Sequence, residues 1–503
     1  MADEDVKHAW TRDQSTLLRV SKPALAVAVL FLILQTIGIT VYVASRKGDG
    51  NVLNTHTLSD AASAPMSPPA LQTKNVSEDI HRLLSDAEAI AVYKKTHGMD
   101  PPPGFDMWLN FTTQANCSMD ITFYAQIYRD LAPWWKDGIN PASLEHIDLS
   151  RGLTHTISFD TTTRKFMGYQ DAFWILQLPK IFEPIEPIFQ LHKEFKFVMN
   201  GFDEPRHLFN PNKTSADWQS PADLFAHSQC FRDHYEKVQP YHAYLQTPAT
   251  FVTKNVHAPI FSQCKPQCYE DIVMPMHYHQ KIALGGRVVD PVRWEDKLPV
   301  LFFRGANTGG WSHVEFDWQM YHRIRLVEWG VQYAKQHPGL SFDAGKDKPP
   351  AIDEGQVAVD IGFYAYSNEC TDELTKKYLM QRFGVKGTVE FTDTLKFKYL
   401  IVVDGHAWPS RLQQYLQTNS VILYNGIFTD FFNWRLLPWV HYVPIAKDFS
   451  DLEDTLVWLQ KNDDKARQIM ENAHTLMNVV GSLSHMQCYT SLLLLEYSRL
   501  YNA

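Results

Sequence analysis

Short apolar segments alternate with longer amphipathic segments over most of the chain. Residues 195–199, 300–303, 399–403 and 421–424 are mainly apolar, and each segment is too short for a helix. Their β-branched and aromatic residues favour strands, and the weak polar alternation is typical of parallel strands that are buried on both faces. The pattern therefore predicts an α/β fold.

A βαβ unit is predicted for residues 399–424. After the strand at 399–403 comes a turn, and residues 411–417 then have helical character, with Ser410 at the position of an N-cap. The strand at 421–424 completes the unit. The loop and the helix N-terminus would direct free N–H groups at one point, where an anion such as a diphosphate can bind.

Local composition and predicted elements divide the chain after the first 44 residues into a stem, two domains and a final helix. Residues 45–95 begin with a stretch rich in Ala, Ser, Thr and Pro, which predicts a stem, and they end in a helix that links the stem to the body. We expect two α/β domains, in residues 96–280 and 281–481, and a final helix in residues 482–503.

The segment at residues 23–44 is apolar except for one glutamine and two threonines, and its 22 residues can span a bilayer as a helix. More basic residues precede it than follow it, which predicts a cytosolic tail at residues 1–22 and a lumenal body. We expect a single-pass type II protein of the Golgi or endoplasmic reticulum membrane. A cleaved signal peptide is the alternative, but the long apolar run and the tail before it argue against one.

The net charge bears on the functional class of the protein, and the cysteines and sequons bear on its compartment. The net charge is −9 and no long basic run occurs, which argues against nucleic-acid binding. All six cysteines follow the apolar segment, so up to three disulfides are expected in an oxidising lumen. Glycosylation sequons begin at Asn75, Asn110, Asn116 and Asn212.

A glycine-rich loop follows one of the predicted strands, in the sequence VLFFRGANTGG. Gly305, Gly309 and Gly310 allow the backbone to approach a ligand closely, and Arg304 and Thr308 offer hydrogen-bond donors. An ordinary surface loop is the alternative, because short glycine motifs are frequent.

Three further arginines are candidates for phosphate binding. Arg411 falls in the first turn of the predicted helix, and its planar guanidinium suits bidentate contact with phosphate. Arg323 and Arg325 follow the glycine-rich loop on a predicted helix, but residues two apart cannot share one helical face. One of the two is expected to face the site, and which one is left open. A solvated or ion-paired arginine is the alternative at each position.

The segment from FKYL through DG and SR to LLPWVHYVP, residues 397–444, resembles the core of glycosyltransferase family 90. That family contains protein O-glucosyltransferases and capsule-associated xylosyltransferases. The resemblance covers most of residues 99–501 and is strongest in residues 300–310 and 397–444. It implies the GT-B arrangement, in which two Rossmann-like domains face a cleft, and an inverting glycosyltransferase that uses a UDP-sugar.

The resemblance also implies roles for the donor-site candidates. The family has an Arg-Gly-Ser-Thr-Thr-Gly-Gly-like loop that contacts the nucleotide sugar; this chain departs from it at Ala306 and Asn307 and matches it at Arg304, Gly305, Thr308, Gly309 and Gly310. An Arg-x-Arg of the family, one arginine of which binds the diphosphate, corresponds to Arg323 and Arg325.

Two more donor contacts follow from the resemblance. The Ser-Gly-Arg of the family corresponds to residues 409–411, where the arginine is retained as Arg411 and Ser410 replaces the glycine. Asp430 falls where the family has an acid before Trp-Phe and would bond the ribose, although Phe431 replaces the tryptophan. A structural acid in a turn is an equal alternative for Asp430.

Asp203 is the candidate catalytic base. It lies just beyond the strand at 195–199, and ligands of open α/β sheets bind beyond the carboxyl ends of strands. An aspartate in a turn before Pro205 is the alternative from the residues alone. The family has its catalytic aspartate in a matching Asn-x-x-Asp, which favours Asp203, and Glu204 is the neighbouring alternative.

No metal site is predicted. The part expected to be lumenal contains no Asp-x-Asp. Cys264 and Cys268 have suitable spacing, but no second cysteine pair accompanies them. His277 and His279 would lie on one face of a strand, where packing or hydrogen bonding is the better interpretation. We expect a metal-independent transfer to a glycan or protein acceptor, with the UDP-sugar as substrate and no further cofactor.

Two other classes compete with an active transferase. The chain departs from the family pattern at Ala306, Asn307 and Phe431. These departures are compatible with a catalytically inactive, membrane-anchored protein that binds sugars or acts as a scaffold. A lumenal glycoside hydrolase would need two carboxylates flanking one cleft, and nothing in the sequence indicates such a pair.

Overall fold

The structure, a computed structural model, describes residues 84–147, 154–168, 178–205, 207–208, 225–226, 228–246, 257–368 and 371–503. The predicted tail (1–22), membrane segment (23–44) and most of the predicted stem lie outside these residues, as do Asn75, Asn212 and Cys370. Among the helices that are described, none combines the length and the apolar character needed to cross a membrane.

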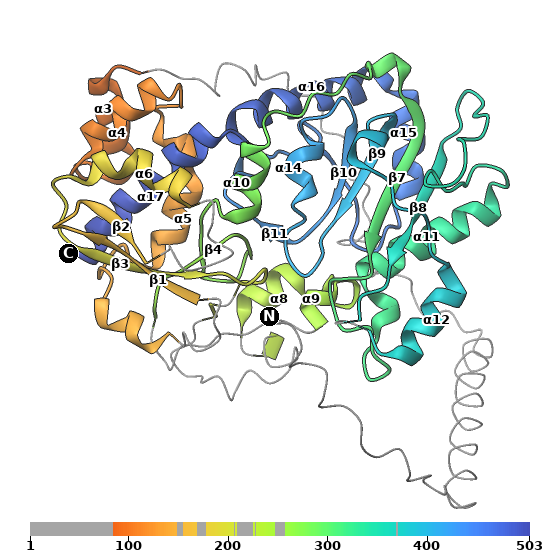
Figure 1. Cartoon of the computed structure of the whole chain (residues 1–503), viewed down its shortest axis with the longest axis horizontal. Coiled ribbons are helices and arrows are strands. Elements are labelled where there is room, and N and C mark those ends of the chain that lie inside the picture. Colours follow the sequence, from red (N-terminus) through yellow and green to blue (C-terminus); the bar gives the residue numbers. More distant parts are fainter. Residues whose placement is uncertain are drawn as a thin grey trace, which may run out of the picture. The chain divides into compact units, whose positions relative to one another are not determined.

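The first sheet is mixed and has the strand order β2-β1-β3-β4-β6 (Figure 1). Strands β3, β4 and β6 run parallel, whereas β1 is antiparallel to both β2 and β3. Only part of this sheet therefore has the parallel order expected of a Rossmann-like domain. The strands are β1 (Thr154–Asp160), β2 (Lys165–Met167), β3 (Phe195–Asn200), β4 (Ile260–Ser262) and β6 (Ile272–Val273).

The second sheet is entirely parallel, with the order β12-β10-β9-β7-β8. Its central strands are buried at nearly every position, which agrees with their continuous apolar sequences. Helix α11 packs against β8, and helix α16 packs against β10. The strands are β7 (Leu298–Ala306), β8 (Ala358–Ala365), β9 (Phe397–Val403), β10 (Val421–Asn425) and β12 (Val443–Pro444).

The four strands predicted from apolar runs are thus confirmed as β3, β7, β9 and β10. The α-helices are α3 (Asp86–His97), α4 (Phe105–Gln114), α5 (Ala125–Leu131), α6 (Pro179–Ile185), α8 (Gln229–Tyr235), α9 (Ala243–Gln246), α10 (His277–Leu284), α11 (His322–Gln336), α12 (Glu373–Phe383), α13 (Phe391–Thr394), α14 (Arg411–Tyr415), α15 (Leu452–Lys461), α16 (Asp463–Val480) and α17 (Leu483–Tyr501).

Two local predictions are wrong. Residues 277–279 begin helix α10 and are not a strand, so His277 and His279 do not share a strand face. The predicted βαβ unit forms, but α14 ends at Tyr415, and Ser410 has helical backbone angles without a capping hydrogen bond from its side chain. Three residues are too few for their periodicity to distinguish helix from strand, which explains the first error.

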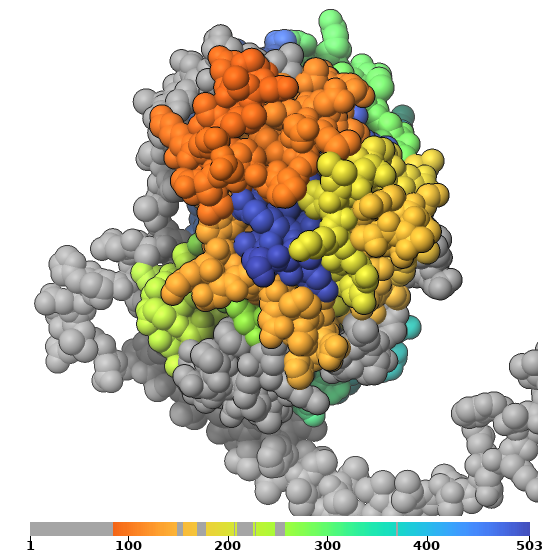
Figure 2. Space-filling view, turned by 90° about the vertical axis from the view of Figure 1, so that its left-hand side faces the viewer, coloured from red at the N-terminus to blue at the C-terminus, as the bar shows by residue number. Residues whose placement is uncertain are grey.

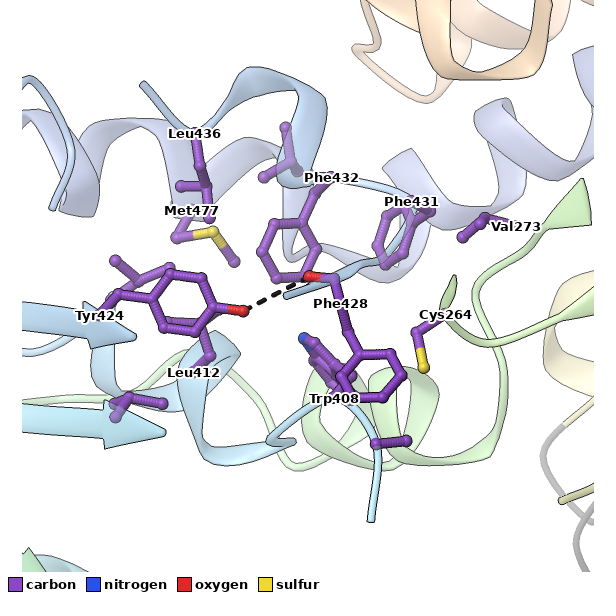
Figure 3. Close-up of a cluster of buried hydrophobic side chains, with 14 of the residues drawn as sticks. Cys264, Val273, Trp408, Leu412, Tyr424, Phe428, Phe431, Phe432, Leu436 and Met477 are labelled. Carbon is purple, nitrogen blue, oxygen red and sulfur yellow. Dashed lines mark hydrogen bonds between the residues drawn. The ribbon is translucent and has the colours of Figure 1, made fainter. Parts of the chain in front are cut away.

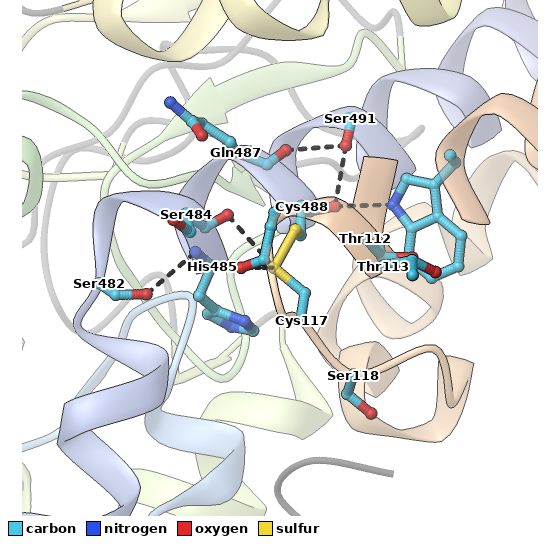
Figure 4. Close-up of a disulfide and its surroundings, with 12 residues drawn as sticks. Thr112, Thr113, Cys117, Ser118, Ser482, Ser484, His485, Gln487, Cys488 and Ser491 are labelled. Carbon is cyan, nitrogen blue, oxygen red and sulfur yellow. Dashed lines mark hydrogen bonds between the residues drawn. A yellow bond between two sulfur atoms is a disulfide. The ribbon is translucent and has the colours of Figure 1, made fainter. Parts of the chain in front are cut away.

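The C-terminal helix α17 returns to the first sheet. It packs against α4 and α6, and the hydroxyl of Tyr497 donates to the Lys196 carbonyl of β3 at 2.8 Å. Figure 2 shows this blue helix surrounded by the orange and yellow segments of the earlier part of the chain. A disulfide between Cys117 and Cys488 fixes the helix to the end of α4 (Figure 4).

A second disulfide joins Cys230 and Cys268, while Cys264 is buried and has no disulfide partner among the described residues. The bond at Cys268 excludes the metal site considered for Cys264 and Cys268. The predicted sequons at Asn110 and Asn116 have exposed asparagines.

Two short strands connect the parts that carry the sheets. Strand β5 (Lys265–Pro266) pairs antiparallel with β11 (Phe428–Thr429). Apolar side chains from both parts meet beside this pair, among them Cys264, Trp408 and Phe428 (Figure 3). All the described residues belong to one compact unit, and the predicted domain boundary at residue 280 stays a prediction.

Candidate active site

Asp203 lies beyond the carboxyl end of β3, as predicted. The side-chain amide of Gln263, which follows β4, donates to the Asp203 carboxylate at 3.3 Å. Asp203 is exposed to solvent by surface area. Partial desolvation by the surrounding protein, followed by the negative charge of Glu204, still raises its pKa above the usual value, and the charge of His406 opposes this shift. His406 follows β9, so the ends of strands from both sheets contribute to the surroundings of Asp203.

A second contact joins the same loops. The thiol of Cys264 donates to the backbone carbonyl of Asp203 at 3.6 Å. The backbone of Trp408, in the loop after β9, also hydrogen-bonds Cys264. The loops after β3, β4 and β9 therefore meet at Asp203, which is the place where an α/β protein holds its ligand.

The glycine-rich loop after β7 packs tightly against neighbouring backbone. Gly309 has a φ of 113°, and a Cβ there would lie 2.7 Å from the Gly405 carbonyl oxygen. A Cβ on Gly310 would lie 2.6 Å from the Cβ of Ala243. Glycine is required at both positions by these approaches and, at Gly309, by the backbone angle. Contact of this loop with a nucleotide sugar stays a prediction.

Arg323 links the loops after β7 and β9. Its guanidinium donates to the Asp404 carbonyl at 2.7 Å, to the Ala306 carbonyl at 2.8 Å and to the Thr308 hydroxyl at 2.7 Å. Arg325 lies elsewhere on α11, where it donates to the Asp448 carbonyl at 2.9 Å and stacks over Tyr241. The geometry therefore places Arg323, and not Arg325, at the glycine-rich loop.

Arg304 has buried partners of its own. Its guanidinium is 2.7 Å from the carboxylate of Asp360 and 3.0 Å from that of Asp343. The ammonium of Lys386 is also 2.7 Å from Asp360. The charge of Arg304 is thus compensated inside the second sheet, and its predicted contact with the donor stays a prediction that the structure does not favour.

Arg411 reaches the same strand end. It is half-buried, and its Nη1 donates to the backbone carbonyl of Arg304 at 2.5 Å. Among the described residues this is the one hydrogen bond of the Arg411 guanidinium, so most of its donors remain for a ligand. Arg411 therefore stays the strongest candidate for a diphosphate contact.

Asp430 is completely buried and stabilises a turn. Its carboxylate accepts the backbone N–H groups of Phe432 and Asn433 at 3.0 and 3.1 Å, and Nε2 of His279 is 3.4 Å away. Burial raises the pKa of Asp430. This arrangement favours the turn alternative over a ribose contact. It also supports the interpretation of His279 as a hydrogen-bonding residue.

Two substitutions relative to the family pattern have structural explanations. Asn307 is buried, and its amide donates to the Thr371 hydroxyl at 2.6 Å and accepts the Ser367 N–H at 2.8 Å. Phe431 packs against the rings of His279 and Tyr489. Both side chains support the fold around the site.

A buried polar cluster at the end of β9 was not predicted. Oδ2 of Asp404 lies 3.1 Å from Nε2 of His242 and accepts the Ile427 N–H at 2.6 Å. The ring of His322 stacks on that of His242 at 4.2 Å. Burial raises the pKa of Asp404 to about 6, lowers that of Lys447 to about 8, and lowers those of both histidines well below their usual value.

One signal in the sequence could have indicated Asp404, because it follows the strand at 399–403 directly and precedes a glycine. Its partner His242 carries no such signal. The pairing depends on contacts between residues 162 apart in sequence, which the local pattern does not encode.

Sequence comparison relates this chain to known proteins. The model of Glycosyl transferase family 90 matches residues 246–503, which include the loops after β7, β9 and β10 but not Asp203. Protein O-glucosyltransferase 2 of Danio rerio is 33% identical over 225 residues, which cover 42% of this chain and 37% of that protein. Protein O-glucosyltransferase 3 of Homo sapiens is 27% identical over 252 residues, or 48% and 42% of the two chains.

A viral relative is also similar. The uncharacterized protein 035R of Invertebrate iridescent virus 3 is 28% identical over 258 residues, which cover 46% of this chain and 21% of that protein. The chain thus spans less than half the length of each of these relatives. Because the family match includes half of the chain and the parallel sheet that carries the candidate donor loops, the chain belongs to glycosyltransferase family 90.

Proposed function

We propose that the protein transfers a sugar, glucose or xylose, from a UDP-sugar to a hydroxyl of a protein or glycan acceptor, with inversion at the anomeric carbon. Membership of the family and the names of the protein O-glucosyltransferases support a transferase. The observation that carries the proposal is the convergence of the loops after β3, β4 and β9 at Asp203, whose pKa is raised.

The diphosphate of the donor is held by cations and N–H groups without a metal. Arg411 offers a planar fork of donors at the end of β7, and Arg323 places a second guanidinium beside Thr308. Charge-assisted hydrogen bonds from such groups stabilise the negative charge that develops on the leaving diphosphate. Arg304 contributes through its carbonyl, which positions Arg411, while its own charge is neutralised by Asp360.

Asp203 is the general base of the transfer. The acceptor oxygen forms a bond to the anomeric carbon from the face opposite the diphosphate, and the bond from that carbon to the phosphate oxygen breaks. The hydroxyl proton passes to the Asp203 carboxylate, and UDP leaves. A raised pKa suits this role, because a base with a pKa closer to neutrality accepts a proton more readily.

Location is a separate part of the proposal. Residues 23–44 would anchor the protein as a type II membrane protein of the Golgi or endoplasmic reticulum, with the described residues in the lumen. Protection of the body from protease added outside sealed microsomes, together with cleavage of the tail at residues 1–22, is the expected result. Digestion of the body in intact microsomes would contradict this topology.

A panel of UDP-sugars tests the activity. The purified protein is screened for ligand-induced thermal shift with UDP-glucose, UDP-xylose and other UDP-sugars, and then for release of UDP and transfer to candidate acceptors. We expect one or two donors to raise the melting temperature and to release UDP. Binding of UDP-sugars without any release of UDP would favour the inactive sugar-binding alternative.

A further inference from the structure

Three metal-ligating side chains meet outside the donor loops. His207 follows β3, His257 precedes β4, and Glu270 precedes β6. One ligand atom of each residue lies within 4.8 Å of those of the other two. Nε2 of His257 is 2.8 Å from Oε2 of Glu270. Two imidazoles and one carboxylate form a typical zinc-binding set.

His207 gives the second, independent indication. Its side chain is completely buried, and within the described residues neither ring nitrogen makes a hydrogen bond of acceptable geometry. Buried polar groups normally have partners, so an orphaned imidazole needs an explanation. Burial also disfavours the charged imidazolium, so the ring keeps a lone pair that a metal can use.

We propose that His207, His257 and Glu270 bind a zinc ion. Zinc takes nitrogen and oxygen ligands at about 2.0–2.2 Å in a tetrahedron, which places neighbouring ligand atoms about 3.3 Å apart. One pair of these ligand atoms is now 2.8 Å apart and none of the pairs is more than 4.8 Å apart, so side-chain rotation would be needed to reach this spacing. The zinc ion replaces the direct contact between His257 and Glu270 and gives His207 a partner.

A zinc ion with these three ligands would need a water as the fourth. Glu270 lines a cavity of about 790 Å³ from which this water would come, whereas the two histidines do not line it. The carboxylate of Asp271 accepts the backbone N–H of His207 at 2.7 Å and adds a negative charge close to the cluster. The ammonium of Lys265 also acts on His207, but its charge is compensated by Asp130 at 2.6 Å. Trp134 stacks on His257 with a centroid distance of 4.5 Å, which fixes the plane of that ring.

The bound zinc would hold the loop that carries the candidate base. His207 lies four residues after Asp203, so the metal ties this loop to the segments before β4 and β6. This consequence rests on the proposed function, whereas zinc binding itself does not. The ion would tie these segments together through three protein ligands, and the donor diphosphate is still stabilised by arginines.

Zinc content and stability test the site. Full-length protein without a histidine tag is treated with a chelator, dialysed and titrated with zinc chloride; bound zinc is measured by elemental analysis and stability by melting temperature. We expect about one zinc ion per chain, as one tetrahedral site requires, and a higher melting temperature with zinc. His207→Gln and Glu270→Gln should lose both responses.

His337→Gln is the matched control, because His337 pairs with Glu453 at 3.1 Å on the surface. It should bind zinc as the wild type does, and circular dichroism checks that each variant is folded. Absence of zinc from the wild-type protein, or equal zinc in folded His207→Gln, overturns the site. Zinc binding by a protein that transfers no sugar would contradict the proposed function alone.

Discussion

Nε2 of His242 lies 3.1 Å from Oδ2 of Asp404, and both side chains are completely buried. His242 precedes helix α9 in the part of the chain between β3 and β4, whereas Asp404 follows β9 of the parallel sheet. The same carboxylate accepts the Ile427 N–H beyond β10. The contact therefore orders the loop after β9, which brings Gly405 to the glycine-rich loop and His406 towards Asp203.

Removal of this carboxylate should destabilise the protein. We expect Asp404→Ala to lower the free energy of unfolding by about 3 kcal/mol, because His242 and the Ile427 N–H lose a buried partner. Urea denaturation and melting temperature measure the change. Asp296→Ala is the control, since Asp296 pairs with Arg293 on the surface, and it should show no measurable loss. Equal stability of the two variants would contradict the structural role of Asp404.

The two disulfides should differ in their effect on stability. Cys117 and Cys488 are 371 residues apart, whereas Cys230 and Cys268 are 38 apart. In the chain-entropy account, the longer loop gives about 2 kcal/mol more stabilisation. We expect Cys117→Ser/Cys488→Ser to lower the unfolding free energy more than Cys230→Ser/Cys268→Ser, as measured by urea denaturation. A larger loss of unfolding free energy in the Cys230→Ser/Cys268→Ser variant would show that the disulfide that holds helix α17 is not the more stabilising of the two.

The elements that could be predicted from sequence are those with strong local patterns. Strand β9 was expected at residues 399–403 and occupies Phe397–Val403. The prediction succeeded because a short, β-branched apolar run is typical of a buried parallel strand. The capping role of Ser410 failed, because the chain is already helical at that residue. A single polar residue before a helix is a weaker signal than a continuous apolar run.

The site was predictable only where one strand end carries it. Asp203 was proposed from its place after β3 together with the family resemblance, because the residues alone favoured a turn aspartate, and its role stays a prediction. Arg304 looked like a donor contact, but Asp343 and Asp360 neutralise it, and neither partner is identifiable from the local sequence. The cluster of His207, His257 and Glu270 was missed for the same reason, since its members come from three separate loops.

Arg411 should control donor affinity. Loss of a charge-assisted contact costs about 1.5–3 kcal/mol, so we expect Arg411→Ala to weaken UDP binding about ten- to a hundredfold. Arg411→Lys should recover only part, because a point charge lacks the planar fork. Titration calorimetry with UDP measures this. Arg325→Lys is the control, since Arg325 contacts Asp448 and Tyr241, and it should bind UDP normally. Unchanged affinity in folded Arg411→Ala would remove Arg411 from the site.

Asp203→Asn should impair chemistry and spare donor binding. The asparagine side chain has nearly the shape of the aspartate and can still hydrogen-bond Gln263. It cannot, however, take the proton from the hydroxyl of the acceptor. General-base catalysis contributes about 10²–10⁴-fold, so turnover should fall by that factor while UDP affinity and melting temperature stay near wild type. If Asp203 only stabilised its turn, the variant would melt at a lower temperature and keep its turnover per folded molecule. Rate, affinity and melting temperature measured on one sample decide between these roles.

The pH dependence of transfer should identify which carboxylate is the base. Asp203 works only when deprotonated, and its raised pKa moves the acidic limb of kcat/KM to a higher pH than an ordinary aspartate gives. The charge of Glu204 is one cause of this shift. Glu204→Gln removes that charge, so the pKa of Asp203 should fall and the acidic limb should move to lower pH, with turnover retained at neutral pH. Loss of turnover in Glu204→Gln, together with activity in Asp203→Asn, would instead assign the base to Glu204.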